Sequence, residues 1–196
     1  MKTIIAERLE RLRTVMRREH LAAFIFPSTD PHNSEYVPQH WEGRKWISGF
    51  DGSAGTAVVT LNGAALWTDS RYFIAAAEQL RDTEYVLMKE RVEGTPTMAQ
   101  WLWQQIGESG LTEVAIDGMC ASASQVETLV AELRANGGMT LRTNLDPLAL
   151  IWDGRPPVPD NAVEVLPLQY AGETAHDKLS RLRRSLSQRH ADGMLV

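Results

Sequence analysis

Three short polar blocks between residues 30 and 72 carry most of the residue types that could do chemistry. They read D-P-H-N-S-E-Y (30–36), R-K-W-I-S-G-F-D-G-S-A-G-T (44–56) and A-L-W-T-D-S-R-Y (65–72). Charged and aromatic residues gathered at strand ends and tight turns are where scaffolds usually place function. In the third block, the Arg71 guanidinium could hold a peptide carbonyl or a carboxylate through two aligned N–H donors. The competing interpretation is a surface ion pair of Arg71 with Asp69 or Glu78, which is common and contributes little energy.

The first block also offers side chains of the metal-ligating type, but their pattern is weak. The candidates are Asp30, His32, Glu35 and His40. The block has neither the H-E-x-x-H spacing of zinc peptidases nor cysteine ligands. Asp30 stands directly before a proline, which is typical of a turn. We therefore expect these residues to decorate a turn, with no metal bound there.

The glycines of the second block predict an irregular turn and not a phosphate-binding loop. Gly49, Gly52 and Gly55 recur at three-residue spacing, and glycine adopts backbone conformations that other residues avoid. The block lacks the G-K-[S/T] ending of a P-loop, and it precedes an apolar run typical of a strand, so no helix dipole would face a phosphate. We expect Asp51 and Ser53 to cap the turn's own amide groups.

Alternating helix and strand patterns surround the blocks. Apolar residues at helical spacing predict a helix over residues 3–20, namely Ile5, Leu9, Leu12 and Met16. Runs rich in Val, Ile, Tyr and Trp predict strands at residues 22–26, 56–61, 66–68, 85–88 and 114–117. Further helices are expected at residues 70–80, 97–106 and 122–135, the first capped by Asp69-Ser70 and the last ended by Asn136-Gly137-Gly138.

This order of elements indicates an α/β fold with a layered mixed sheet flanked by helices. Asn62-Gly63, between two apolar runs, is a two-residue hairpin signal, so at least one strand pair should be antiparallel. Most of the tryptophans are expected to fill core or interface positions. Trp101 and Trp103 lie two apart on a predicted helix, so both cannot face the core, and we expect one of them at a domain or subunit contact.

The composition is that of an ordinary soluble globular protein. The 196 residues are 43% hydrophobic and 23% charged, enough for one or two domains with a full core. The net charge of −5, with mixed signs, argues against a nucleic-acid partner. The single cysteine, Cys120, excludes an internal disulfide framework and fits a reducing compartment. No apolar run is as long as a membrane span, and the N-terminus turns charged too early for a secretory signal, so we expect a cytoplasmic protein with no membrane partner.

A proline-rich stretch and a distant repeat suggest two domains. Residues 153–159, D-G-R-P-P-V-P, are the clearest linker, because proline removes donors and fixes the backbone. Residues 178–196 repeat residues 8–26 at an offset of 170, with Leu, Arg, Leu, Arg and His recurring before an apolar run. Two unrelated amphipathic helices could share such common residues, but the matched order favours a duplicated domain. We expect a first domain over residues 1–155 and, over 156–196, a linker and the incomplete start of a second related domain.

Taken in order and at their spacing, the three blocks resemble the opening domain of Xaa-Pro aminopeptidase (aminopeptidase P), in the creatinase/prolidase group. The likeness continues through Leu87-Met88-Lys89, Thr95-Pro96-Thr97 and residues 144–152, so it spans essentially the whole chain. The resemblance implies a creatinase-type N-terminal domain with a ribonuclease-H-like topology. In the family, the arginine of the W-T-D-x-R-Y block resembles a substrate contact, and the matching residue here is Arg71. Ser70 stands where the family usually has glycine, a small change that leaves the arginine's expected role intact.

The family's reaction is hydrolysis of the peptide bond before a proline in second position. Two divalent ions, usually manganese, activate a water there, and their ligands are two Asp, one His and two Glu on a C-terminal domain. No region of this chain matches that domain, so the resemblance implies no catalytic residue, metal ligand or cofactor in this portion, and the chain looks truncated before it. The resemblance implies a non-catalytic N-terminal portion that shapes the site for proline-containing peptides and supports a homodimer.

Other functions stay open at this point. A standalone peptide-binding or interaction domain could use the same pocket without chemistry. A creatinase or prolidase relative would keep the fold and change the substrate. A nuclease, which the ribonuclease-H-like topology suggests, fails on chemistry, because no convincing cluster of metal-binding carboxylates appears and the net charge is negative.

Overall fold

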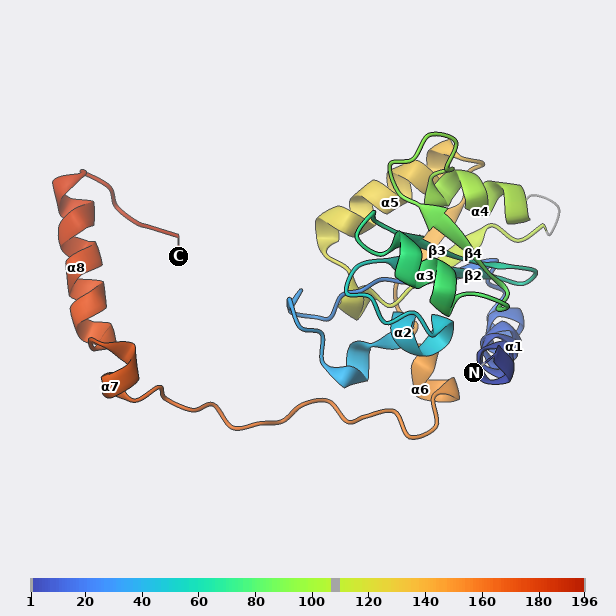
Figure 1. The fold of residues 1–196 in the computed structure, drawn as a ribbon. Helices are drawn as coiled ribbons and strands as arrows, with labels where there is room; N and C mark the ends of the chain where they lie inside the picture. Colours follow the sequence, from blue (N-terminus) through green and yellow to red (C-terminus); the bar gives the residue numbers. More distant parts are fainter. Residues whose placement is uncertain (1, 107–109, 196) are drawn as a thin grey trace. The chain divides into compact units, whose positions relative to one another are not determined.

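A mixed six-stranded sheet forms the frame of the first of the two units into which the chain divides, Met1–Pro159 and Asp160–Val196. The structure is a computed structural model that describes residues 2–106 and 110–195. In the first unit, helices cover both faces of the sheet (Figure 1). The described residues of the second unit form the helices α7 (Leu168–Ala171) and α8 (Ala175–Gln188).

The sheet has the strand order β4-β3-β2-β1-β5-β6. The strands are β1 (Ala23–Phe26), β2 (Thr56–Thr60), β3 (Ala64–Thr68), β4 (Tyr85–Lys89), β5 (Glu113–Ile116) and β6 (Thr140–Arg142). β1, β2 and β3 pair in antiparallel fashion, whereas β3–β4, β1–β5 and β5–β6 are parallel pairs. The antiparallel β1-β2-β3 meander is thus extended by the parallel strand β4 on one side and by the parallel strands β5 and β6 on the other. The predicted mixed α/β sheet is therefore confirmed.

The helices of the first unit form two layers. They are α1 (Lys2–Arg18), α2 (Gly43–Ser48), α3 (Phe73–Gln79), α4 (Met98–Ile106), α5 (Ala123–Ala135) and α6 (Leu148–Ile151). Apolar side chains of α1, α2, α3 and α6 join one core cluster, and those of α4 and α5 join a second cluster. The sheet separates the two layers, and Figure 1 shows α4 and α5 above it and α2 and α6 below it.

The pattern of α1 explains why this segment is helical and where it packs. Ile5, Leu9, Leu12 and Met16 recur every three or four residues, and each is at most 2% exposed. They belong to the same core cluster as Phe24 of β1. Fully burying a side chain of this kind contributes about 1.5–3 kcal/mol. The amphipathic helix predicted at residues 3–20 is confirmed.

The helical period of α4 separates its two tryptophans. Trp101 is buried and packs edge-to-face on Trp67 of β3, with ring centroids 5.5 Å apart. Trp103 is 43% exposed, and its ring lies against Gly137. The expectation that both cannot face the core is confirmed, and a domain or subunit contact for Trp103 stays a prediction.

The predicted start of α3 is wrong. The helix begins at Phe73 and not at residue 70, and Asp69-Ser70 does not cap it. The Asp69 carboxylate instead accepts hydrogen bonds from the backbone N–H of Arg71 (3.0 Å) and from the Arg71 guanidinium. These bonds occupy the oxygens that a helix cap would need.

The β2–β3 hairpin is present, but its turn differs from the predicted one. The turn is centred on Leu61 and Asn62, and Gly63 pairs with Thr60. None of Leu61, Asn62 and Gly63 has a positive φ, so this is not the mirror-image turn that Asn-Gly favours. The Thr60 hydroxyl accepts the Gly63 N–H (3.0 Å) and closes the turn instead.

α5 has a start signal that the sequence analysis did not use. Ser122 Oγ accepts the N–H of Gln125 (3.3 Å), and Gln125 Oε1 accepts the N–H of Ser122 (2.8 Å). This capping box satisfies two amides that the helix itself leaves without partners. At the other end, Gly137 and Gly138 both have positive φ, so the predicted C-terminal signal is confirmed.

Residues after α6 remain attached to the first unit. Arg155 donates to the His40 carbonyl (2.9 Å) and to the Asp146 carboxylate (2.5 Å). The His40 ring is hydrogen-bonded through Nδ1 to the Pro156 carbonyl (2.7 Å). The first unit extends to Pro159, beyond the boundary expected at residue 155.

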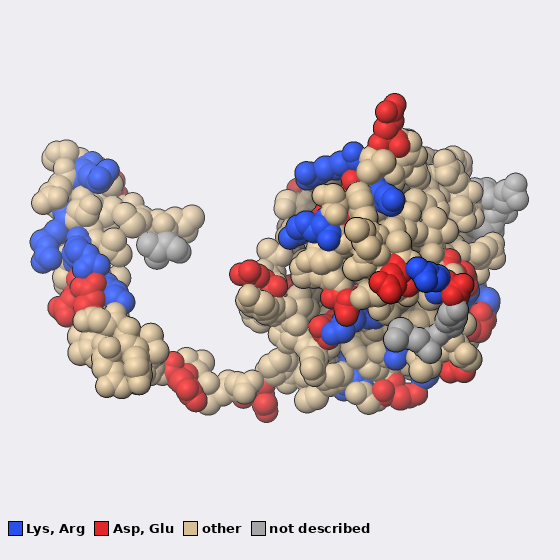
Figure 2. Space-filling view, viewed as in Figure 1, with Lys and Arg blue, Asp and Glu red and all other residues tan. Residues whose placement is uncertain are grey.

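The surface of the first unit carries both signs of charge. Figure 2 shows Lys and Arg interspersed with Asp and Glu over the viewed face. Ion pairs such as Arg11–Asp153 (2.7 Å) and Arg17–Glu10 (2.8 Å) join opposite charges there. Among the helices that the structure describes, none has the length and apolar character needed to cross a membrane.

Gly55 tests how closely the start of β2 approaches β3. Its φ is +156°, and a Cβ added there would lie 2.8 Å from the Trp67 carbonyl oxygen, which strand pairing holds in place. We expect Gly55→Ala to lower the free energy of unfolding by about 2–4 kcal/mol, because it combines backbone strain with overpacking. Urea unfolding followed by tryptophan fluorescence measures this loss.

The matched control is Gly94→Ala. Gly94 also has a positive φ (+83°), but nothing lies within 4 Å of an added Cβ. This variant should lose only about 1 kcal/mol, the cost of the left-handed conformation. Equal losses for the two variants would contradict the close approach at Gly55.

Candidate functional site

The three polar blocks meet at one edge of the sheet, where β1, β3 and β5 end and β2 begins. Side-chain hydroxyls tie their loops together. Ser28 Oγ donates to the Gly55 carbonyl (2.5 Å), which joins the end of β1 to the start of β2. Thr68 Oγ1 donates to the Ala54 carbonyl (2.7 Å), which joins the end of β3 to the same turn. Side chains that lie far apart in the sequence are therefore held together at this edge.

We call residues 49–55 the glycine turn, and its backbone lies directly against the third block. Gly49, with a φ of +76°, ends α2 in the left-handed conformation. Gly52 is so close to Tyr72 that an added Cβ would lie 2.8 Å from Tyr72 Cδ1. Phe50 is buried and meets the Tyr72 ring edge-on, with centroids 5.9 Å apart. The turn leads into strand β2 and not into a helix, as predicted.

Arg44 supports the glycine turn through hydrogen bonds to its backbone, and the sequence analysis did not single it out. It is 7% exposed, and its guanidinium donates to the carbonyls of Phe50 (3.0 Å) and Gly52. No carboxylate of the described chain forms an ion pair with it, and its Nε has no hydrogen-bond partner. Burial lowers the pKa of Arg44 to about 10, so it stays charged at neutral pH. In the sequence, only its neighbours Trp46 and Ile47 on the short helix α2 hinted at its burial.

Asp51 and Ser53 do not cap the turn's amides, so that prediction is wrong. The Asp51 carboxylate accepts Gln79 Nε2 (2.6 Å), and the Asp51 N–H donates to Gln79 Oε1 (3.1 Å). Ser53 Oγ lies 2.7 Å from the Tyr72 hydroxyl and forms a hydrogen bond with it. Both side chains form hydrogen bonds with residues outside the turn, Asp51 with Gln79 and Ser53 with Tyr72. They link the glycine turn to α3 and to the third block.

Arg71 stands at the same edge of the sheet, with its side chain 66% exposed. Its Nε and Nη2 donate to the Asp69 carboxylate at 2.9 and 2.8 Å, and its guanidinium carbon lies 5.2 Å from the Tyr72 ring centroid. These hydrogen bonds lower the pKa of Asp69, so the pair stays ionised at neutral pH. The ion pair that the sequence left open is present, with Asp69 and not with Glu78. It leaves Nη1 without a partner in the described residues, so the Nη1/Nη2 edge is free to bind a ligand.

Asp30 organises the first block as a turn, as predicted. It is 4% exposed, and its Oδ1 accepts the backbone N–H groups of His32 (2.9 Å) and Ser34 (3.0 Å). Burial raises the pKa of Asp30, but the hydrogen bonds outweigh it and the net shift is downward. The turn displays Tyr36 at 85% exposure. Asp30 is therefore a scaffold residue, and the residues after it are the ones available to a ligand.

The residues considered for a metal site do not converge. Asp30 Oδ1 accepts two backbone N–H groups, Asp30 Oδ2 is buried without a hydrogen-bond partner, and the His40 ring is hydrogen-bonded to the Pro156 carbonyl. Within residues 2–106 and 110–195, no group of three or more His, Cys, Asp or Glu side chains is arranged to hold a metal ion. The described residues thus do not fit a metal pair, and we derive no metal-dependent step from them.

A cavity of about 200 Å³ with both polar and apolar walls lies between the first block and the glycine turn. Its lining includes both signs of charge, from Glu35, Arg44, Lys45 and Asp51. Tyr36 lines the same cavity and adds an aromatic surface. A cavity of this size could take a short peptide segment or one large side chain, but not a whole cofactor.

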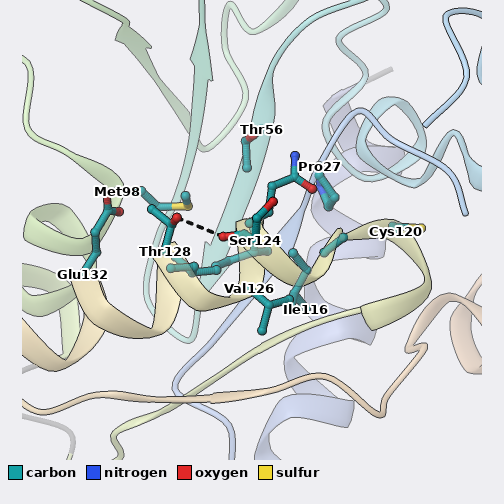
Figure 3. A pocket seen from close by; sticks show the side chains of 13 residues that line it. Pro27, Thr56, Met98, Ile116, Cys120, Ser124, Val126, Thr128 and Glu132 are labelled. Atoms are coloured by element: carbon teal, nitrogen blue, oxygen red, sulfur yellow. Dashed lines mark hydrogen bonds between the residues drawn. The ribbon is translucent and has the colours of Figure 1, made fainter. Parts of the chain in front are cut away.

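A second cavity, of about 360 Å³, opens between α5 and the sheet (Figure 3). Its walls are largely apolar and include Ile25, Ile116 and Leu129. The hydroxyl of Thr128, which also lines it, donates to the Ser124 carbonyl within α5 (2.9 Å). Among the described residues that line this cavity, no side-chain nitrogen or oxygen is both buried and without a hydrogen-bond partner. The cavity therefore offers no polar group committed to orienting a ligand.

Cys120 lines this apolar cavity, and its surroundings disfavour the thiolate form. Burial, reinforced by the nearby carboxylates of Asp117 and Asp146, raises the pKa of Cys120 to about 12. Because the thiolate is the reacting form, we expect a thiol–disulfide reagent at pH 8 to label the folded chain about 1000-fold more slowly than the urea-unfolded chain. Absorbance stopped-flow or quenched mass spectrometry measures both rates. Equal rates would contradict the raised pKa.

Comparison with known proteins extends the likeness over the whole chain. A family model described as the creatinase/prolidase N-terminal domain matches residues 8–143. The chain is 40% identical over 198 residues to a probable Xaa-Pro aminopeptidase P from Aspergillus flavus, and 39% identical to one from Aspergillus niger. These alignments cover 100% of this chain and 30% and 32% of the relatives. The chain thus spans about a third of the length of the curated relatives it matches.

Solved structures support the same relationship. The X-prolyl aminopeptidase from Caenorhabditis elegans, described as a cytosolic enzyme with a di-nuclear active site, is 30% identical with a TM-score of 0.77; the match covers 96% of this chain and 32% of that one. The N-terminal domain of the cytoplasmic peptidase PepQ from Mycobacterium tuberculosis H37Rv shares the fold, with 22% identity, a TM-score of 0.53 and coverage of 74% of this chain and 98% of that one. Sequence blocks, sheet topology and family model agree, and the chain belongs to the creatinase/prolidase N-terminal domain family.

Proposed function

We propose that this chain is the non-catalytic N-terminal portion of a metal-dependent Xaa-Pro aminopeptidase, a hydrolase that removes the first residue from peptides with proline in second position. The observation that carries this proposal is the 40% identity to a probable Xaa-Pro aminopeptidase P along the whole chain. The alignment covers 30% of that relative, and no cluster of three or more His, Cys, Asp or Glu side chains among the described residues could hold a metal ion. We therefore assign hydrolysis to other parts of such an enzyme and expect the 196 residues alone to be inactive.

In this proposal Arg71 contacts the bound peptide. Asp69 occupies the Nε/Nη2 edge of the guanidinium at 2.9 and 2.8 Å and so fixes its plane. The Nη1/Nη2 edge then presents aligned donors that suit a peptide carbonyl or a carboxylate. The contact would be charge-assisted, and such hydrogen bonds are roughly twice as strong as neutral ones.

We further propose two divalent metal ions in the whole enzyme, a homodimeric assembly and a cytoplasmic location. Two divalent ions, manganese by family resemblance, would make a bound water nucleophilic near neutral pH when held by residues outside this chain. The residues around the cavity of about 200 Å³ between the first block and the glycine turn would wall the site and limit peptide length. The cytoplasmic location is in keeping with the C. elegans relative described as cytosolic.

We also propose that a second related domain begins within residues 156–196. His20 and His190, which are 170 positions apart, both follow a helix and have positive φ values of 57° and 51°. The N–H of the residue after each histidine reaches the carbonyl five residues back, at 2.9 and 3.0 Å. Residues other than glycine are uncommon in this conformation. The repeated helix end therefore supports duplication more strongly than the shared leucines and arginines do.

Removal of the Arg71 guanidinium tests the peptide contact. In a full-length enzyme that contains this chain, Arg71→Ala should lower kcat/KM on a synthetic Xaa-Pro tripeptide about 10- to 100-fold, because a charge-assisted hydrogen bond is lost from the bound state. Steady-state kinetics with added manganese measure the change. Arg71→Lys should restore only part of it, since an ammonium lacks the planar pair of donors.

Arg81→Ala is the matched control, because Arg81 is another exposed arginine, ten positions further along the chain, with no side-chain partner in the described residues. Its kinetics should equal those of the unmodified enzyme. Unchanged kcat/KM for Arg71→Ala on several Xaa-Pro peptides would overturn the assignment of Arg71. Absence of any Xaa-Pro hydrolysis by the full-length protein would instead favour a standalone binding domain.

The duplication has its own test in two equivalent leucines. Leu12 is fully buried on α1, and Leu182 is its counterpart on α8, where no described residue is buried. In the 196-residue chain, Leu12→Ala should lower the free energy of unfolding by about 2–5 kcal/mol, and Leu182→Ala by less than about 0.5 kcal/mol. In a full-length protein, Leu182→Ala should become as destabilising as Leu12→Ala. Denaturant unfolding measures all four values, and a persistently neutral Leu182→Ala would contradict a second packed domain.

A further inference from the structure

The buried charge of Arg44 needs an explanation that stability alone does not supply. Arg44 is 7% exposed and forms no ion pair with a carboxylate of the described chain. A buried charge without an ion-pair partner is expensive compared with a well-packed apolar residue. Its hydrogen bonds go to the carbonyls of Phe50 (3.0 Å) and Gly52, and its guanidinium carbon lies 4.9 Å from the Phe50 ring centroid. Arg44 therefore fixes the backbone of the glycine turn at Phe50 and at Gly52.

The glycine turn restricts the position of the Tyr72 side chain. Gly52 lies against one side of the Tyr72 ring, where an added Cβ would be 2.8 Å from Cδ1. Phe50 meets the ring edge-on, with an interplanar angle of 80°. Ser53 Oγ holds the Tyr72 hydroxyl at 2.7 Å. Ring and hydroxyl are thus both set by residues of the glycine turn, 19 or more positions earlier in the chain.

Tyr72 is also a platform for Arg71. The Arg71 guanidinium carbon lies 5.2 Å from the Tyr72 ring centroid, which is within the range of a cation–π contact. Asp69 holds the Nε/Nη2 edge from the side. Because the Arg71 side chain is 66% exposed, these are the contacts of the described structure that restrict where its free edge points.

We propose that the glycine turn orients the Arg71 guanidinium through Tyr72, which makes Ser53 and Tyr72 positioning residues for peptide binding, an inference that rests on the proposed function of Arg71. Arg44 anchors this relay at its buried end. This relay gives a reason for the second and third blocks to lie at one edge of the sheet. The second block holds Tyr72 in place, and Tyr72 orients Arg71 of the third block. Neither Ser53 nor Tyr72 needs to touch the peptide.

A double-mutant cycle in the full-length enzyme tests this relay. Ser53→Ala removes an exposed hydroxyl, and Tyr72→Phe removes its partner while keeping the ring, so neither change should prevent folding. With a synthetic Xaa-Pro tripeptide and added manganese, each variant should lower kcat/KM about 3- to 10-fold, as the loss of one hydrogen bond allows. In an Arg71→Ala background the same changes should have no further effect, because the group they position is absent.

Thr128→Ala is the control, since it removes a hydroxyl that bonds within α5 and should leave kcat/KM unchanged in both backgrounds. Wild-type kinetics for Ser53→Ala and Tyr72→Phe, together with a strong Arg71→Ala defect, would overturn the relay and leave the role of Arg71 intact. Equal losses with and without Arg71 would also overturn it, because the effect would then be general to the fold. No defect for Arg71→Ala would overturn the proposed role of Arg71 and the relay with it.

Discussion

The close passage of the glycine turn under the end of β3 is the constraint on which the rest of the site depends. A Cβ at Gly55 would lie 2.8 Å from the Trp67 carbonyl, and one at Gly52 would lie 2.8 Å from the Tyr72 ring. Backbone and ring can approach this closely only where no side chain intervenes. That approach lets loops from β1, β2 and β3 share one edge, where Ser28 and Thr68 tie them together.

A buried arginine and an exposed arginine have different roles at this edge of the sheet. Arg44 is buried and holds carbonyls of the glycine turn, whereas Arg71 is exposed and keeps one edge of its guanidinium free. The two arginines illustrate how burial assigns roles to one side-chain type: the desolvated guanidinium serves the fold, and the hydrated one is available to a ligand. The ion pair with Asp69 fixes the plane of the Arg71 guanidinium and leaves its Nη1/Nη2 edge uncovered.

Much of the fold was predictable from the sequence because its signals repeat over many residues. The stripe from Ile5 to Met16 and the short β-rich runs located α1 and β1 to β5 to within a few residues. Single-residue signals were less dependable: Asp69 reads as a helix cap, yet its carboxylate is taken by Arg71. The resemblance of its block to the family singled out Arg71, and its role stays a prediction. The burial of Arg44 and the Ser53–Tyr72 bond were not predictable, because both depend on tertiary contacts that no local spacing records.

The most direct test of the account is a crystal structure of a full-length Xaa-Pro aminopeptidase containing this chain, with a non-hydrolysable Xaa-Pro peptide bound. We expect Arg71 Nη1 and Nη2 to lie about 2.7–3.2 Å from a peptide oxygen, while Asp69 stays bonded to the Nε/Nη2 edge and Tyr72 to Ser53. A peptide bound in the active site with no atom within hydrogen-bond distance of Arg71 would contradict the central claim that this edge of the sheet presents Arg71 to the substrate.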